Sequence, residues 1–398
     1  MKNGWKVKSL AELCEVFADG DWVESKDQST EGIRLIQTGN VGDGVFKDRS
    51  EKARHISEAT FKRLRCTEIF EGDCLISRLP DPVGRACILP DTGERMITAV
   101  DCSILRFSSN AVTPQFFTYY AQSRQYLADV DAETTGTTRN RISRSSLGRI
   151  PVPVPSMREQ QRIVAILDEA FDGISTAKAN AEKNLQNARE LFENHQQSVF
   201  ARHVTGRTEK IFADVCEISS ALVDPRKKEF LDLLHVGGAN ITSKTGELFD
   251  LKTAREEGLI SGKFLFGETM VLYSKIRPYL MKVVRPDFQG LCSADIYPLS
   301  AKVGLLDKDY LFHLLLSPGF TDYANAGSAR AGMPKVNREH LFAFRLSLPP
   351  VEEQKKIASW LDELHDETQR LESLYQQKLA ALDELKKSLL HEAFSGKL

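Results

Sequence analysis

The sequence predicts an α+β protein in which two tandem, strand-rich domains are each followed by one long α-helix. Two observations predict this fold class. The pattern Pro-x-x-x-Glu-Gln-x-x-Ile occurs at Pro155 and again at Pro349, 194 residues later, and both copies continue into Leu-Asp-Glu. Short motifs that precede the first copy also precede the second, in the same order. Such repetition indicates one structural unit used twice, and hence a pseudo-two-fold internal repeat.

The composition is that of an ordinary globular chain. Of 398 residues, 41% are hydrophobic and 27% are charged, which allows two or three domains with sizeable cores. No apolar run approaches the roughly 18 residues that a membrane span needs, and the N-terminal residues do not resemble a signal peptide. The seven cysteines are scattered without a CxxC pair, which predicts reduced thiols and a cytoplasmic location. The net charge of −2 does not indicate nucleic-acid binding, so local charge has to be considered.

The first domain is expected to span residues 1–155. Tight turns and short apolar runs predict a strand and a Ser9-capped helical turn within 5–14, and further strands at 33–36, 70–78, 85–89, 103–107 and 149–155. A helix is expected at 113–123, because Thr113 can cap it and Pro114 suits its first position. The aromatic residues of this helix recur at helical spacing, which favours a core role over a base-stacking platform.

The second domain, residues 208–349, repeats this order with lower identity. The stretch Gly267–Leu272 follows the pattern of Gly72–Ile76, a turn glycine and an acidic residue before a buried strand. The helical segment 310–317 matches 116–123 at the same 194-residue offset. A retained framework with divergent contents indicates two domains that recognise different targets.

The remaining segments, 156–207 and 350–398, are predicted to be two long helices that pair as an antiparallel coiled coil and act as a spacer. Pairing with another chain is the alternative. Apolar residues alternate in steps of three and four, and the first series contains two consecutive four-residue steps after Ala177. This irregularity, with Gly206 and Gly396 only 190 residues apart, predicts a four-residue insertion in the first helix. The first series is Ile163, Leu167, Ala170, Ile174, Ala177, Ala181, Leu185, Ala188, Phe192, His195 and Val199, and the second is Ile357, Leu361, Leu364, Thr368, Leu371, Tyr375, Lys378, Leu382, Leu385 and Leu389.

Motifs of catalysis are not found in the sequence. It contains no dinucleotide-binding GxGxxG after a strand, no P-loop, no HExxH and no GxSxG, and no Asn/Asp-Pro-Pro-aromatic run of the kind that base methylation uses. No metal-ligating cluster is evident. We therefore expect a non-catalytic protein.

Local charge points to DNA instead. Three stretches, 136–149, 269–286 and 325–338, each carry several Arg or Lys residues and no acidic residue. Ser, Thr, Asn and Gly residues lie between these cations. Such side chains suit phosphate contacts and hydrogen bonds to base edges, although any one stretch could equally be a solvated basic loop. The candidate DNA-binding residues are Gln37, Thr38, Asn40, Arg78, Arg85, Thr137, Thr138, Arg139, Asn140, Arg141, Arg144, Asn240, Lys275, Arg277, Ser328, Arg330, Lys335 and Asn337.

The features that carry a family resemblance are both Pro-x-x-x-Glu-Gln helices, the strand motifs ending at Arg78 and Lys275, and the terminal Phe394–Leu398. The chain resembles the DNA-specificity (S) subunit of type I restriction-modification systems over its whole length. The resemblance implies two target recognition domains that each read half of a bipartite DNA sequence. It implies that the paired helices set the unread gap and dock two modification (methyltransferase) subunits, and that restriction subunits with translocase and nuclease activity join them. S-adenosylmethionine, ATP and Mg²⁺ are expected on those partners, and no cofactor or metal on this chain. The expected docking residues are Glu159, Gln160, Ile163, Leu167, Glu353, Gln354, Ile357 and Leu361.

Two alternatives remain at the level of sequence. One is an S-like subunit of a type IIB restriction system, which gene neighbourhood would distinguish. The other is a coiled-coil scaffold that does not bind DNA, which would retain modification subunits without sequence-specific DNA binding.

Overall fold

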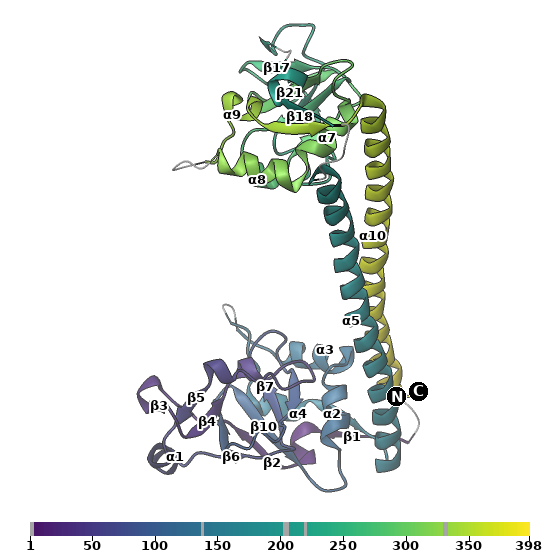
Figure 1. The fold of residues 1–398 in the computed structure, drawn as a ribbon. Coiled ribbons are helices and arrows are strands. Elements are labelled where there is room, and N and C mark those ends of the chain that lie inside the picture. Colours follow the sequence, from purple (N-terminus) through teal and green to yellow (C-terminus); the bar gives the residue numbers. More distant parts are fainter. Residues whose placement is uncertain (1–3, 137–138, 202–206, 219–220, 329–332) are drawn as a thin grey trace. The chain divides into compact units, whose positions relative to one another are not determined.

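The structure is a computed structural model that describes residues 4–136, 139–201, 207–218, 221–328 and 333–398 (Figure 1). The chain divides into two compact units. The first unit comprises Met1–Ala181 and Gln377–Leu398, and the second comprises Glu182–Gln376. Each unit therefore contains one strand-rich domain and parts of both long helices.

The first unit begins with short strands and 3-10 helices and ends in a helical segment. Its strands are β1 (Lys6–Ser9), β2 (Cys14–Asp19), β3 (Gln28–Ser29), β4 (Ile33–Ile36), β5 (Arg54–Ile56), β6 (Glu68–Ile69), β7 (Cys74–Ser77), β8 (Ala86–Ile88), β9 (Met96–Thr98), β10 (Cys102–Phe107) and β11 (Pro151–Val154). Its helices are η1 (Leu10–Leu13), η2 (Ser25–Asp27), η3 (Thr38–Asn40), η4 (Ser50–Lys52), α1 (Glu58–Leu64), α2 (Pro114–Tyr120), α3 (Arg124–Ala132) and α4 (Arg144–Arg149).

The second unit has a similar succession of elements, without counterparts of η2, η3, η4 and α1 among the described residues. Its strands are β12 (Thr208–Ile211), β13 (Cys216–Glu217), β14 (Leu222–Val223), β15 (Leu234–Val236), β16 (Lys252–Thr253), β17 (Lys263–Phe266), β18 (Met270–Ser274), β19 (Val283–Val284), β20 (Gly290–Cys292), β21 (Ile296–Ala301) and β22 (Arg345–Leu348). Its helices are α6 (Phe212–Val215), η5 (Pro278–Leu280), α7 (Lys308–Leu315), α8 (Pro318–Ala326) and α9 (Arg338–Phe342).

Sheet topology confirms the internal repeat. Among the described residues, each unit has a two-stranded, a four-stranded and a five-stranded sheet. The four-stranded orders are β2-β10-β7-β8 and β13-β21-β18-β19, all antiparallel. Each five-stranded sheet contains one parallel pair, β4 with β9 and β15 with β20. The two halves therefore have one fold with mixed sheets, as the α+β prediction requires.

The predicted helix at 113–123 forms as α2, with the Thr113 hydroxyl accepting a hydrogen bond from the N–H of Phe116. Its aromatic side chains Phe116, Phe117 and Tyr120 are buried in the core of the first unit. This confirms their core role. The predicted basic loop at 136–146 is shorter than expected, because Ser143 caps a short helix, α4, that begins at Arg144.

The two long helices are α5 (Met157–Ala201) and α10 (Val351–Ser395), each of 45 residues. In the first unit Lys178 forms an ion pair with Asp383, and in the second unit Arg189 forms one with Glu372. The rings of Phe192 and His365 lie 5.1 Å apart. As the residue numbers rise along α5, the numbers of the α10 residues that they contact fall. The helices therefore pair antiparallel within each unit, as predicted.

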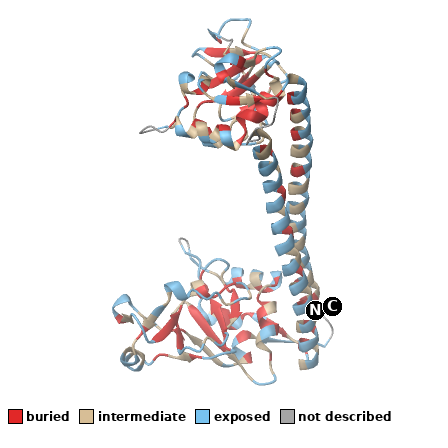
Figure 2. Ribbon diagram, viewed as in Figure 1, coloured by how far each residue is buried: buried red, intermediate tan, exposed pale blue. Residues whose placement is uncertain are grey.

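The details of the helix seam differ from the heptad prediction. His195, Lys378 and Leu385 are exposed, whereas Gln196 is buried and Leu379 and Lys386 are half-buried. Figure 2 shows that both long helices carry buried and exposed residues along their length. An α-helix of 3.6 residues per turn drifts by about 20° per heptad against a 3.5-residue repeat, so the contact stripe moves to the next position in both helices. Over the described residues the two helices are equally long, but α5 ends beside residues 202–206, which lie outside that description, so the four-residue insertion stays a prediction.

Each unit buries the start of one long helix and the end of the other. The core of the first unit contains Ile163 and Leu167 from α5 together with Leu390 and Phe394 from α10. The core of the second unit contains Ala358, with Phe200 packed against it. The strand-rich domains and the helices therefore share continuous cores.

Candidate nucleic-acid interface

In the first unit the end of β7 meets the predicted basic loop. Arg78 follows β7, and its backbone carbonyl accepts a hydrogen bond from the N–H of Ile142 at 3.3 Å. The guanidinium of Arg78 donates to the carbonyl of Val100 at 2.5 Å and lies 3.3 Å from the carboxylate of Asp19. Arg141 forms an ion pair with Asp101 at 2.8 Å. Arg78 and Arg141, which the sequence suggested as separate DNA-binding candidates, therefore lie in one site.

The second unit repeats this connection, with the loop residue 194 positions later and the residue after the strand 197 positions later. The N–H of Val336 donates to the carbonyl of Lys275 at 2.9 Å, as Ile142 does to Arg78. The ammonium of Lys275 donates to the carbonyl of Ala294 and lies 3.3 Å from Asp295. Lys335, which corresponds to Arg141, pairs in a β-bridge with Ile276. Both domains therefore place a basic loop beside the end of the same central strand.

Helix caps fix the far end of each loop. The Ser143 hydroxyl accepts a hydrogen bond from the N–H of Ser146 at 3.0 Å, and the side-chain oxygen of Asn337 accepts one from His340 at 2.7 Å. Both residues have extended backbone and short polar side chains, as N-caps require. The amide of Asn337 is therefore used at least partly in capping α9.

Several predicted DNA-binding side chains form hydrogen bonds within the protein. Arg85 is 8% exposed and donates to the carbonyls of Thr38, Val41, Leu79 and Pro82, so it ties two loops together. The remaining members of this group are Arg78, Lys275, Ser328 and the two turn residues Asn40 and Asn240, whose side chains bond to backbone groups. These hydrogen bonds favour a structural role for them in the free chain.

The other predicted residues are more accessible. Gln37 and Thr38 are half-buried at η3, and the exposed residues are Arg139, Asn140, Arg141, Arg144, Arg277 and Lys335. The side chain of Arg144 is 50% exposed although it lies 4.0 Å from Asp19. Thr137, Thr138 and Arg330 lie outside the described residues. Apart from Arg277, in the turn after β18, these accessible cations lie in the loops before α4 and α9 or, for Arg144, at the start of α4.

Two further exposed residues join this region and were not predicted. Tyr279 in η5 is 52% exposed, and Met333 is 59% exposed. Tyr279 lies two residues from Arg277, whose N–H donates to the carbonyl of Pro334 at 2.9 Å. No sequence pattern distinguishes an exposed Tyr or Met from a buried one, so only the loop pairing reveals them.

The helix residues expected to dock partners are mostly internal. Gln160, Ile163, Leu167, Gln354 and Leu361 are each no more than 1% exposed. Ile357 and Glu159 are half-buried and Glu353 is exposed. Five of the eight are thus packed within this chain, which favours a structural role for the Glu-Gln motif itself.

The two glutamines make the same contacts in both units. The side-chain oxygen of Gln160 accepts from the N–H of Thr113, and its nitrogen donates to the carbonyls of Ala111 and Pro155. The side chain of Gln354 does the same with Asp307, Leu305 and Pro349. Each partner pair is 194 residues apart, so this clamp is part of the repeat.

A carboxylate about two turns after each glutamine binds the corresponding neighbouring helix, α2 in the first unit and α7 in the second. Asp168 accepts a hydrogen bond from the hydroxyl of Tyr119 in α2. Asp362 lies 2.7 Å from Nε2 of His313 in α7 and 2.5 Å from a guanidinium nitrogen of Arg285. Burial acts to raise the pKa of Asp362, but the hydrogen bonds from His313 and Arg285 outweigh it and lower the pKa to about 2. This aspartate is therefore ionised when it holds the domain to its helix.

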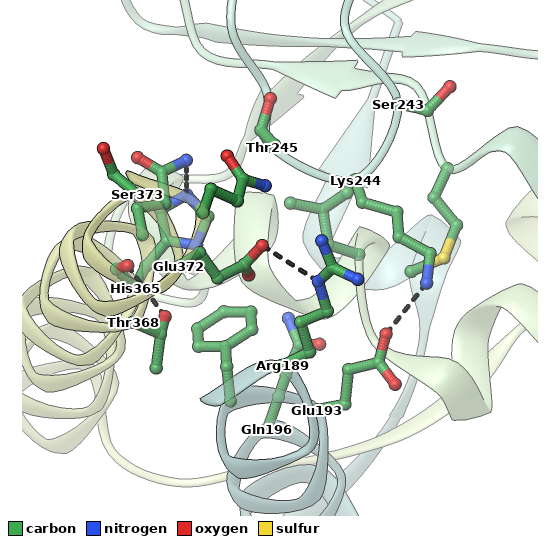
Figure 3. Close-up of a pocket in the computed structure, with 15 residues that line it drawn as sticks. Arg189, Glu193, Gln196, Ser243, Lys244, Thr245, His365, Thr368, Glu372 and Ser373 are labelled. Carbon is green, nitrogen blue, oxygen red and sulfur yellow. Dashed lines mark hydrogen bonds and ion pairs between the residues drawn. The ribbon is translucent and has the colours of Figure 1, made fainter. Parts of the chain in front are cut away.

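A pocket of about 530 Å³ in the second unit lies between the two helices and the loop at 243–245 (Figure 3). Its charged side chains are paired, Arg189 with Glu372 and Lys244 with Glu193. Gln369 and His365 bond to each other on its α10 wall. The pairing leaves little net charge, so the pocket offers less for DNA than the basic loops do.

Neither a membrane span nor a metal cluster is found in the described parts of the chain. None of the helices there combines the length and the hydropathy needed to cross a bilayer. Within the same residues, no three His, Cys, Asp or Glu side chains converge as a metal site would require.

Comparison with known proteins decides the family. A family model described as the type I restriction modification DNA specificity domain matches residues 2–186 and 210–380. The chain belongs to this family. The two matched segments correspond to the two repeats, so each half is a DNA specificity domain of the family.

Individual relatives in the family are distant. The type I restriction enzyme EcoDI specificity subunit of Escherichia coli is 28% identical over 300 residues, 66% of this chain and 66% of that protein, just under two thirds of its length. The putative type I restriction enzyme MjaX specificity subunit of Methanocaldococcus jannaschii is 20% identical over 424 residues, 99% and 93% of the two chains.

Solved structures show the same fold. A chain from a study of complex assembly and conformational transition of the type I R-M system has a TM-score of 0.77 at 16% identity, covering 100% of this chain and 99% of that one. The HsdS subunit from Thermoanaerobacter tengcongensis has a TM-score of 0.63 at 17% identity, covering 100% and 98%. The mixed fold with two domains and two long helices is therefore that of specificity subunits.

Proposed function

We propose that this chain is a non-catalytic DNA-specificity subunit of a type I restriction-modification complex, in which each recognition domain reads one half of a bipartite duplex target. The observation that carries the proposal is the repeated basic loop. In both domains the loop is hydrogen-bonded to the residue that follows the central strand, Arg78 or Lys275, and ends at the helix cap Ser143 or Asn337. A duplicated loop on one scaffold suits a target with two separately read parts.

The exposed and the buried cations have different roles in this proposal. Arg139, Arg141, Arg144 and Lys335 are accessible to phosphates and base edges. Arg78, Arg85 and Lys275 instead stabilise the loops, because their side chains donate hydrogen bonds to backbone carbonyls. Phosphate contacts fix the register on DNA, whereas contacts to bases select the sequence.

Partner subunits supply the chemistry in this proposal. The paired helices would set the unread gap and bind two modification subunits, which carry S-adenosylmethionine, and restriction subunits would bring ATP-dependent and Mg²⁺-dependent activities. Because most of the Glu-Gln motif is internal, docking would use the exposed helix faces around it, which include Arg158 and Glu353. The buried motif would hold those faces in place.

The proposal is tested by co-expression with the neighbouring modification subunit, followed by sequencing of methylated DNA. We expect methylation at one bipartite sequence with two defined parts and an unread gap. Replacement of residues 208–349 by the corresponding domain of another family member should change one part and leave the other intact. Methylation at sites that share no bipartite sequence would contradict the proposal. So would an assembled complex that methylates no duplex DNA.

A further inference from the structure

We propose that Tyr279 and Met333 form the base-contacting tip of the second recognition domain, an inference that rests on the proposed function and assigns specificity within it. Both side chains are more than half exposed, and they lie on two loops that are bonded to each other. A single exposed apolar side chain is ordinary, but two that are brought to one place by bonded loops mark a contact site.

The tip is held in one conformation by its backbone. Ile276 pairs with Lys335, the N–H of Arg277 donates to the carbonyl of Pro334 at 2.9 Å, and the N–H of Lys244 donates to Met281 at 3.1 Å. Arg277 and Met281, which flank η5, both have φ of 50°, a left-handed conformation that side chains other than glycine seldom adopt. Pro278 is buried beneath the turn. A turn fixed in this way is pre-organised for contact.

Charge around the tip favours DNA as the occupant. Arg277, Lys335 and Arg338 are exposed on the same two loops and at the start of α9. Among the neighbouring carboxylates, Asp295 is paired with Lys275, and Glu339 is exposed in α9. An apolar tip within a cationic surround can contact thymine methyl groups or insert at a base step, while the cations contact phosphates.

The first domain lacks this pair at the matching positions. Met333 corresponds to Arg139, 194 residues earlier, and the turn after β7 has the sequence Arg78-Leu-Pro-Asp-Pro82 in place of Lys275-Ile-Arg-Pro-Tyr279. The two domains therefore present different chemistry at one structural position. This difference predicts that the tip affects only the half-site read by the second domain.

The test uses the full chain co-expressed with its modification subunit and a pool of duplex DNA of random sequence, from which bound duplexes are selected and sequenced. For Tyr279→Ala and Met333→Ala we expect loss of base preference in one half-site, and a roughly tenfold fall in the affinity ratio between selected and mismatched duplexes. Lys335→Ala should leave the selected sequence unchanged and reduce the slope of log affinity against log salt by about 0.9. Ile260→Ala, at a residue 78% exposed in the same unit, is the matched control.

The outcomes separate this inference from the proposed function. If the unmodified complex selects no bipartite sequence, the proposed function fails. If it selects one and both tip variants retain the same sequence and affinity ratio, the inference is overturned. Loss of the modification subunit from the Tyr279→Ala complex with unchanged DNA selection would show a protein contact, and would also overturn it.

Discussion

The side-chain oxygen of Gln160 accepts a hydrogen bond from the backbone N–H of Thr113 at 2.9 Å, at the point where α5 enters the first domain. The same residue donates to the carbonyl of Ala111 at 3.0 Å. Gln354 makes the equivalent bonds to Asp307 and Leu305. A single amide thus satisfies a donor and an acceptor of the loop before α2 or α7, which explains why the repeat retains glutamine.

Gln160→Ala is expected to lower the free energy of unfolding of the first unit by roughly 1–3 kcal/mol, because it leaves buried backbone groups without partners. Urea denaturation of the full chain, followed by circular dichroism, measures this loss. Arg158→Ala, on the exposed face of the same helix, should change stability by less than about 0.5 kcal/mol. Equal effects of the two substitutions would contradict the clamp.

Asp362→Asn is expected to lower the melting temperature at neutral pH and to lose this effect in acid. The pKa of Asp362 in the folded chain is about 2, below the ordinary 3.8, so its stabilising contribution is complete above pH 3.8 and disappears as pH falls toward 2. Melting curves of both proteins between pH 6 and pH 2.5 should therefore converge at the acid end. Glu363→Gln, at an exposed neighbour, serves as the control. A constant difference across this pH range would count against the Asp362 network.

Leu382→Ala and Leu385→Ala distinguish the observed helix seam from a regular heptad. Leu382 is half-buried, whereas the side chain of Leu385 is 47% exposed. We expect Leu382→Ala to cost roughly 1–2 kcal/mol of stability, and Leu385→Ala less than about 0.5 kcal/mol. Denaturation midpoints of the full chain measure both. Similar losses at the two positions would restore the heptad assignment.

Arg139→Ala is expected to weaken DNA binding by the assembled complex, because the side chain is exposed in the loop of the first domain. One lost phosphate contact should reduce the slope of log affinity against log salt by about 0.9. Fluorescence anisotropy with a labelled duplex at several salt concentrations gives this slope. Lys62→Ala, at a residue 74% exposed in α1, should leave the slope unchanged. An unaltered slope for Arg139→Ala would remove this residue from the interface.

The repeat, the α+β class, the position of the two long helices and the family could all be predicted from the sequence. These follow from patterns that are local in the chain: Pro and Glu-Gln at a helix start, turn glycines before apolar strands, and apolar residues at helical spacing. The strand β4 at Ile33–Ile36 and the start of helix α2 after Thr113 were predictable for this reason. The antiparallel pairing of α5 and α10 also followed, because neither helix has another partner in the repeat.

The accessibility of the candidate residues could not be predicted in this way, because it depends on how the chain folds around them. Arg85 and Arg139 are equally basic in the sequence, yet carbonyls from two loops surround Arg85 while Arg139 is exposed. The Glu-Gln motif suggested a docking surface, but Gln160 is fully buried against a loop 47 residues away. Burial and hydrogen bonding depend on segments far apart in the chain, so a local pattern indicates the type of side chain but not the partners that fold around it.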